Sequence, residues 1–257
     1  MERRRILVTG ATGRTGRLVV EKLRRLPQAF DVVGLARSSA RLQEVFGSSE
    51  GFVLGDIRDR AAMDAAIKGC QALVILTSAS PKPQQATPPG ERPSFAYEPG
   101  GSPEQVDGEG QRHQIDAAVA AGVEHVVLVG SMGGTQIDHP LNKMGGGNIL
   151  IWKRRSENDL IASGLSYTII RAGGLLDQPG GRRELLVGKD DAFLNETPGG
   201  IPPAVPRADV AELVVQALLH PEARNKAFDL ISKPEDEAGA VVTSDFAALF
   251  RQISSGL

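Results

Sequence analysis

The sequence predicts a doubly wound α/β fold, in which helices cover both faces of a mostly parallel sheet. Short, continuously apolar segments of strand length recur along the chain, and they lack the polar alternation of a strand with one face in water. Segments with the apolar spacing of helices lie between them. Strands buried on both faces that alternate with helices indicate a parallel sheet between two helical layers.

The elements can be placed in order along the chain. The first strand is expected at 6–8, and a helix at 13–26 follows it with apolar side chains at Leu18, Val19 and Leu23. Further strands are expected at 31–36, 52–57, 72–77, 126–130 and 167–171. Helices between them are expected at 60–68, 104–121 and 148–162.

After residue 171 the pattern loosens into segments rich in glycine and proline. Later elements are expected as strands near 184–188 and 227–231 and as helices at 208–219 and 244–254. We expect residues 172–257 to contribute a small C-terminal substrate lobe to a single domain that spans 1–257, because this length suits one α/β domain. The proline-rich connection 80–103 is long for a compact domain, which indicates a functional or disordered loop.

Composition narrows the classes of function. The 29 basic and 31 acidic residues give a net charge of -2, so no global basic field favours a nucleic-acid partner. No membrane span is expected, because no run approaches the roughly 18 apolar residues that a span needs. The single cysteine excludes an internal disulfide and favours a reducing compartment. The first strand begins by Ile6, so we expect a cytoplasmic protein, or a plastid stromal one if a transit peptide has been removed.

The strongest chemical signal is the glycine-rich turn after the first strand. The run is Thr9-Gly10-Ala11-Thr12-Gly13-Arg14-Thr15-Gly16, and it opens the first helix. Such a turn lets backbone N–H groups and the positive helix end approach a pyrophosphate, so it predicts a dinucleotide site. The expected ligands here are Gly10, Thr12, Gly13, Arg14, Thr15 and Gly16. The alternative is a turn whose glycines are only structural.

The residues after the second and third strands favour NADP(H) over NAD(H). No carboxylate follows the second strand, where NAD-specific folds bind the ribose hydroxyl; Arg37 stands there instead. Arg37 and Arg14 could form a two-armed clamp on a 2′-phosphate, or they could be solvated surface charges. Asp56 and Ile57 are placed to contact adenine, although Asp56 could equally cap the next helix.

These motifs resemble those of the atypical short-chain dehydrogenases, and most closely the NmrA-like proteins of plants and cyanobacteria. The resemblance rests on 9–16, Arg37, 55–57, 73–78, 130–134, 152–153 and 171–174. It extends to the reductase-like half of a plastid import component and, more distantly, to flavin and biliverdin reductases. It implies a Rossmann sheet in the order 3-2-1-4-5-6 and an NADP(H) cofactor. Further cofactor contacts implied by it are Leu76, Thr77, Ser78, Lys153, Ala172 and Gly173.

The catalytic pattern of that superfamily is incomplete in this chain. Its members typically carry a tyrosine one helical turn before the lysine, but Ile149 precedes Lys153 here. The matched Lys153 is expected to bind the nicotinamide ribose, and Ser131 to face the substrate; the alternatives are an exposed lysine and a turn serine. His139 is a candidate acid, or part of a structural turn. No metal site is expected, because one cysteine and four scattered histidines do not form one.

Three functions remain open. One is a reductase whose flavin-, quinone- or tetrapyrrole-like acceptor takes its proton from water, so that no tyrosine is needed. Another is an NADP(H) redox sensor or scaffold that acts on a protein partner. A third hypothesis is an isomerase or epimerase that uses a tightly held cofactor. The sequence leaves the acceptor and the oligomeric state open.

Overall fold

The computed structural model describes residues 3–84 and 94–256. In this part of the chain, a central eight-stranded sheet has the order β10-β12-β8-β7-β4-β1-β2-β3. The strands are β1 (Arg4–Thr9), β2 (Phe30–Ala36), β3 (Phe52–Leu54), β4 (Ala72–Ile75), β7 (His125–Ser131), β8 (Tyr167–Ala172), β10 (Leu185–Gly188) and β12 (Lys226–Ser232). Every pairing is parallel except that of β10 with β12. The predicted order 3-2-1-4-5-6 is therefore confirmed, with β12 as a seventh parallel strand.

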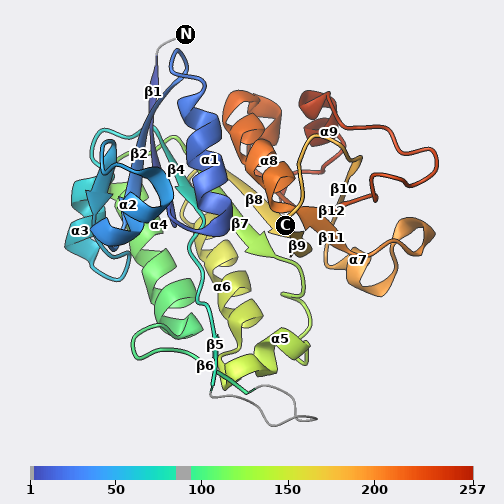
Figure 1. Cartoon of the computed structure of the whole chain (residues 1–257), viewed down its shortest axis with the longest axis horizontal. Coiled ribbons are helices and arrows are strands. Elements are labelled where there is room, and N and C mark those ends of the chain that lie inside the picture. The colour runs from blue at the N-terminus through green and yellow to red at the C-terminus, as the bar shows by residue number, and fades with distance from the viewer. Residues whose placement is uncertain (1–2, 85–93, 257) are drawn as a thin grey trace.

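Helices cover both faces of this sheet (Figure 1). One layer contains α1 (Arg14–Arg24), α8 (Arg207–Leu219) and α9 (Phe246–Arg251), and the other contains α3 (Arg60–Ala66), α4 (Gly110–Ala120) and α6 (Ile149–Ala162). Ile6 and Val8 of β1 lie in the core under α1, and Leu7 lies in the core on the opposite face. This is the alternation that a strand buried on both faces requires.

Several elements differ from the sequence prediction. Helix α2 (Ser39–Phe46) was not predicted; the Ser38 hydroxyl accepts the Arg41 N–H at its start, and Gly47 ends it at φ 69°. The predicted helix 104–121 begins as a π-helical segment, Glu104–Glu109, before α4. The strand expected at 52–57 ends at Leu54, where pairing with β2 stops. Further short helical segments are α5 (Pro140–Lys143), α7 (Ala192–Asn195), Met144–Gly146, Pro198–Gly200 and Pro221–Ala223.

The chain beyond residue 172 both extends the sheet and builds structure outside it. β10 and β12 join the central sheet, and α8 packs against α1. Outside the sheet, β9 (Gly174–Leu176) pairs with β11 (Ala204–Pro206). Figure 1 shows α7 at the same end of the molecule as β10 and β12. The lobe predicted for 172–257 thus shares two of its strands, β10 and β12, with the central sheet.

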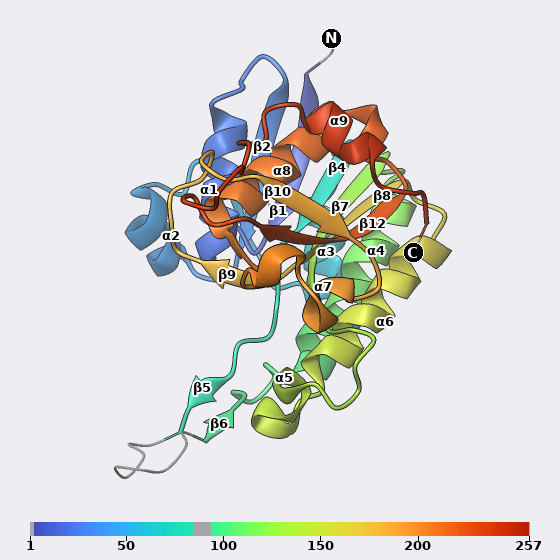
Figure 2. The same ribbon diagram turned by 90° about the vertical axis from the view of Figure 1, so that its right-hand side faces the viewer.

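The proline-rich connection forms a hairpin in its described parts. β5 (Lys82–Pro83) pairs with β6 (Phe95–Ala96), and Figure 2 shows this hairpin extending away from the sheet. Residues 85–93 of the predicted loop lie outside the described residues. Among the helices of the described chain, none has the length and apolar character needed to cross a membrane.

Candidate functional site

The predicted cofactor residues meet at one edge of the sheet. The glycine turn follows β1, and the other predicted segments follow β2, β3, β4, β7 and β8. Parallel strands place their carboxyl ends at the same edge, and the order of connections reverses between β1 and β4. Ligands of doubly wound folds bind at this reversal point. The structure thus gathers these segments at the position that a dinucleotide occupies.

Close backbone contacts build the glycine turn. Gly10 has φ +67°, and a Cβ there would lie 2.7 Å from the carbonyl carbon of Leu76, which follows β4. A Cβ on Gly16 would lie 2.0 Å from the Gly10 carbonyl oxygen, so α1 packs directly on the turn. Exposed Gly13 precedes α1 without a side-chain cap, which leaves the first-turn N–H groups open. The turn therefore fits a pyrophosphate bound by backbone N–H groups.

Gln114 of α4 was missed by the sequence analysis, although it links the ends of β1 and β4 at the candidate site. Its buried amide oxygen accepts the Thr9 hydroxyl at 2.6 Å, and its nitrogen donates to the Thr77 hydroxyl at 3.2 Å and to the Gly110 carbonyl at 3.1 Å. Gln111 lies beside it and donates to the Thr77 carbonyl at 3.4 Å. The signal that could have revealed these residues was the presence of two glutamines on the buried face of one helix, because a buried amide needs specific hydrogen-bond partners.

The two arginines of the proposed phosphate clamp have different neighbours. Arg14 forms an ion pair with Asp177, which follows β9, and the same carboxylate accepts the Arg207 Nε–H at 3.0 Å. Arg37 is exposed at the end of β2, near enough to Asp56 for its charge to act there. Arg14 thus has a carboxylate partner within the protein. A clamp on the 2′-phosphate formed by Arg14 and Arg37 together stays a proposal.

Asp56 and Ile57 lie directly beyond β3. The Asp56 carboxylate accepts the Arg58 Nε–H at 2.9 Å and an Arg58 Nη2–H at 2.6 Å. These bonds, and more weakly the charge of Arg37, lower the pKa of the Asp56 carboxyl. Asp59, not Asp56, caps α3, so the helix-cap alternative for Asp56 is wrong. Ile57 is buried. Their contact with adenine stays a prediction.

Lys153 forms a buried ion pair that its sequence position did not reveal. Its Nζ donates to Asp107 Oδ1 at 2.7 Å, and the other oxygen of Asp107 accepts the Ala79 N–H at 2.8 Å. Asp107 is fully buried and Lys153 is 8% exposed, so the alternative of an exposed helix lysine is wrong. The ion pair ties α6 to the π-helical segment Glu104–Glu109, and Asp107 in turn holds the chain that follows β4. An ammonium has three N–H donors, which leaves Lys153 donors for a ribose.

Ser131 and His139 both lie around the loop that follows β7. The Ser131 hydroxyl is half-buried at the end of the strand and donates to the Met132 carbonyl at 3.0 Å. The His139 Nδ1 accepts the Leu141 N–H at 3.2 Å and caps α5. This contact favours the interpretation of His139 as part of a structural turn over that of a catalytic acid. A Cβ on Gly133 would lie 3.3 Å from the His139 ring, so the imidazole borders this loop.

The structure supplies no tyrosine at the position one turn before Lys153, where half-buried Ile149 stands. Tyr97 comes from the end of the proline-rich hairpin and packs beside Gly145 and Gly147, ahead of α6. Its hydroxyl donates to the Met144 carbonyl at 3.5 Å. Burial, followed by the charge of Asp107, raises the pKa of Tyr97. A phenol held in this way is poorly suited to ionise.

A buried network of charged side chains joins β8 to α6 and β12. Arg171 of β8 donates through Nε to Glu157 of α6 at 2.8 Å, and its Nη1 lies 3.8 Å from Asp229 Oδ1. Asp229 is fully buried. Burial and the nearby charge of Asp191 raise the pKa of Asp229 to about 6, against the opposing effect of Arg171. One carboxyl of this network therefore titrates close to neutral pH.

This titration predicts a pH-dependent stability difference between the wild type and Asp229→Asn. The folded pKa lies above the ordinary value of 3.8, so the folded state binds the proton more tightly than the unfolded state. The resulting stability is present below that ordinary value and is lost as pH rises through about 6. Wild-type unfolding free energy should fall relative to the variant by up to about 1.4 kcal/mol per pH unit in this window. Urea unfolding at pH 4 to 7 tests this, and a pH-independent difference would contradict it.

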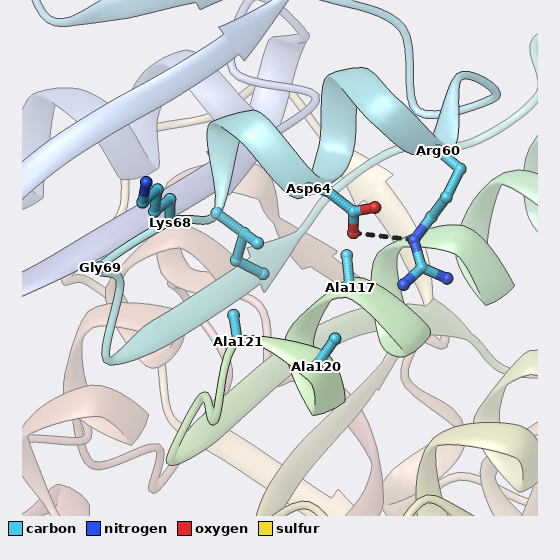
Figure 3. Close-up of a pocket in the computed structure, with 8 residues that line it drawn as sticks. Arg60, Asp64, Lys68, Gly69, Ala117, Ala120 and Ala121 are labelled. Atoms are coloured by element: carbon cyan, nitrogen blue, oxygen red, sulfur yellow. Dashed lines mark hydrogen bonds and ion pairs between the residues drawn. The ribbon is translucent and has the colours of Figure 1, made fainter.

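A separate surface pocket of about 300 Å³ lies between α3 and α4 (Figure 3). Arg60 and Asp64 form an ion pair at its rim, and Ala117, Ala120 and Ala121 line the opposite side. It also reaches residues 67–69, which precede β4 and thus lie toward the amino end of that strand. The dinucleotide residues lie at the carboxyl edge, so this pocket is not part of the candidate site.

The chain belongs to the NAD(P)H-binding family, whose match covers residues 10–221. Sanguinarine reductase of Eschscholzia californica is 49% identical over 97% of this chain and 96% of its own. An uncharacterised chloroplastic protein of Arabidopsis thaliana is 52% identical over 97% of this chain and 75% of its own. Rice protein TIC 62, also chloroplastic, is 32% identical over 81% of this chain and 42% of its own. The resemblance to NmrA-like, atypical short-chain dehydrogenases is confirmed by these matches.

Solved structures with the same fold are more distant in sequence. A putative NAD-dependent epimerase/dehydratase from Bacillus halodurans has a TM-score of 0.72 at 20% identity, covering 97% of this chain and 99% of its own. ChuY, an anaerobillin reductase from Escherichia coli O157:H7, has a TM-score of 0.65 at 22% identity, covering 90% and 99%. At such identities these structures establish the fold alone.

Proposed function

We propose that this protein is an NADP(H)-dependent reductase of a small conjugated acceptor, which receives its proton from water rather than from a tyrosine. One observation supports the proposal: the predicted cofactor segments gather at one edge of the sheet, while Ile149 occupies the position of the usual proton donor, one turn before Lys153. A site without that acid is unsuited to ordinary carbonyl reduction. Flavins, quinones and tetrapyrroles accept a hydride without it.

The chain's own residues would bind and orient the reactants. The bound cofactor supplies a hydride. The glycine turn holds the pyrophosphate through N–H groups, and Lys153 donates to the nicotinamide ribose. The family resemblance places the carboxamide near the backbone of Ala172 and Gly173, at the end of β8. A Cβ on Gly173 would lie 2.4 Å from the Pro203 carbonyl oxygen, so the glycine lets the chain after β8 pack against the chain before β11. Ser131 faces the acceptor from the end of β7.

The relatives support a reductase of small acceptors. Sanguinarine reductase matches almost the whole of both chains. Among similar folds, ChuY is named an anaerobillin reductase, and an Escherichia coli protein with a TM-score of 0.57 is an NADPH-dependent quinone oxidoreductase. The chloroplastic relatives also make the plastid stroma a candidate location beside the cytosol expected from the sequence.

The activity test is NADPH oxidation by the purified protein, followed by absorbance, with flavins, quinones, biliverdin, sanguinarine and simple carbonyls as acceptors. We expect turnover with one of the conjugated acceptors and none with simple carbonyls. An Ile149→Tyr variant is the matched control, because it restores the missing phenol without adding a charge. Tight NADPH binding with no turnover on any acceptor would contradict a reductase and favour the sensor.

Cofactor preference gives a second test at the adenosine end. Arg37→Asp is expected to weaken NADPH binding by more than about tenfold, because it removes a guanidinium from the 2′-phosphate and adds a repelling carboxylate. NADH binding should stay within about twofold of the wild type. The matched variant Arg14→Ala shows whether the second arm contributes. Equal losses for NADPH and NADH in Arg37→Asp, measured by fluorescence titration, would refute the phosphate contact.

A further inference from the structure

One buried carboxylate from the C-terminal part of the chain holds the loop that follows β7. Asp191 precedes α7 and is 2% exposed. Its Oδ1 accepts the Gly133 N–H at 2.7 Å, and its Oδ2 accepts the Thr135 N–H at 2.8 Å and the Thr135 hydroxyl at 2.7 Å. A single side chain thus satisfies three donors of the loop that begins at Ser131.

The backbone around this carboxylate is held in an uncommon conformation. Asp190 and Asp191 both have positive φ, 55° and 61°. Consecutive left-handed residues other than glycine persist only where their surroundings hold them. Here the Asp191 N–H donates to Asp229 Oδ2 at 2.7 Å. Asp229 lies in β12 beside Arg171 of β8, so the conformation is anchored in the core of the sheet.

We propose that Asp191 is a positioning residue that sets the conformation of the loop 131–135 and so shapes the nicotinamide and acceptor end of the site. The inference rests on the proposed function for the identity of that end. An ionised carboxylate only accepts hydrogen bonds, which suits a site where all three partners are donors. The Asp191 contacts lie at the end of β7. The glycine turn and Arg37 follow β1 and β2, and β4 separates these two strands from β7 in the sheet. The adenosine half of the cofactor is therefore outside its reach.

Asp191→Asn tests this assignment, because the amide has nearly the same shape but turns an NH₂ group toward N–H or O–H donors. Binding is compared for NADPH and for adenosine 2′,5′-bisphosphate, which carries only the adenosine half. We expect NADPH to bind about tenfold more weakly and the bisphosphate to bind within about twofold of the wild type. With the best acceptor, kcat should fall about tenfold or more while the acceptor KM changes less.

Two further variants make the result decisive. Asp190→Asn removes the same charge from the neighbouring residue, whose carboxylate is exposed, and should leave both ligands and kcat unchanged. Thr135→Val removes one donor only and should weaken NADPH binding about threefold, even if Asp191→Asn fails to fold. Equal weakening of NADPH and the bisphosphate, or no change in either, would overturn the assignment. The binding comparison needs no turnover, so failure of the proposed reductase activity is distinguished from failure of this inference.

Discussion

Replacing Gly16 with alanine should abolish measurable NADP(H) binding, with a loss of more than about 100-fold in affinity. The added Cβ would lie 2.0 Å from the Gly10 carbonyl oxygen and 3.1 Å from the Ala11 Cα, and both neighbours are backbone. Neither can move as a side chain can, so α1 must shift away from the turn and carry its N–H groups out of position. A 100-fold loss corresponds to about 2.7 kcal/mol.

The measurement is fluorescence titration of NADPH, with circular dichroism to confirm that the variant is folded. Arg17→Ala is the matched control, because this residue is exposed on the same helix and its truncation leaves the turn unchanged. Overpacking of a core contact typically costs about 1–3 kcal/mol of stability, so a folded variant is expected. Binding by Gly16→Ala within tenfold of the wild type would show that the turn tolerates a Cβ and would contradict the packing described.

Asp107→Asn is expected to lower the free energy of unfolding by about 3–5 kcal/mol, because it leaves the Lys153 ammonium buried without a counter-charge. The substitution is nearly isosteric, and an amide oxygen can still accept the Ala79 N–H. The loss therefore reports the missing charge rather than a missing backbone contact. Urea unfolding of the wild type and the variant at neutral pH measures it.

The double variant Asp107→Asn with Lys153→Met is the control for this prediction. It removes both charges, so it should recover a large part of the stability that the single variant loses. It should bind NADPH more weakly than the wild type does, because it lacks the ammonium that we propose as a donor to the ribose. A double variant as unstable as Asp107→Asn alone would mean that packing, rather than the buried charge, explains the loss.

The secondary structure was well predicted wherever apolar periodicity was strong. The buried strands around β1, β4, β7 and β8 are continuous apolar segments, and their predicted positions are close to those observed. Helix α2 was missed because it is short and buries only Leu42. Its boundary signals were nevertheless present in Ser38 and Gly47, which are a typical N-cap and a typical left-handed end.

The candidate site was predicted in part. The glycine turn and Arg37 follow from local order along the chain, because a turn and the residue after a strand are set by their immediate neighbours. Lys153 was matched by position, but its buried partner Asp107 lies 46 residues away on another helical segment, and no local pattern pairs the two. Gln114 was missed for the same reason.

Four features follow from residue order along the chain alone: the alternation of strands and helices, the glycine turn, the arginine in place of an acidic residue after β2, and Ile149 in place of a tyrosine. All of these are properties of residue type and local spacing. Long-range packing sets which polar groups meet: Asp107 with Lys153, Asp177 with Arg14, and Asp191 with the loop after β7. Such pairs are set by sheet order and helix packing, which bring distant segments together, and a buried charge is stable only where that packing supplies its partner.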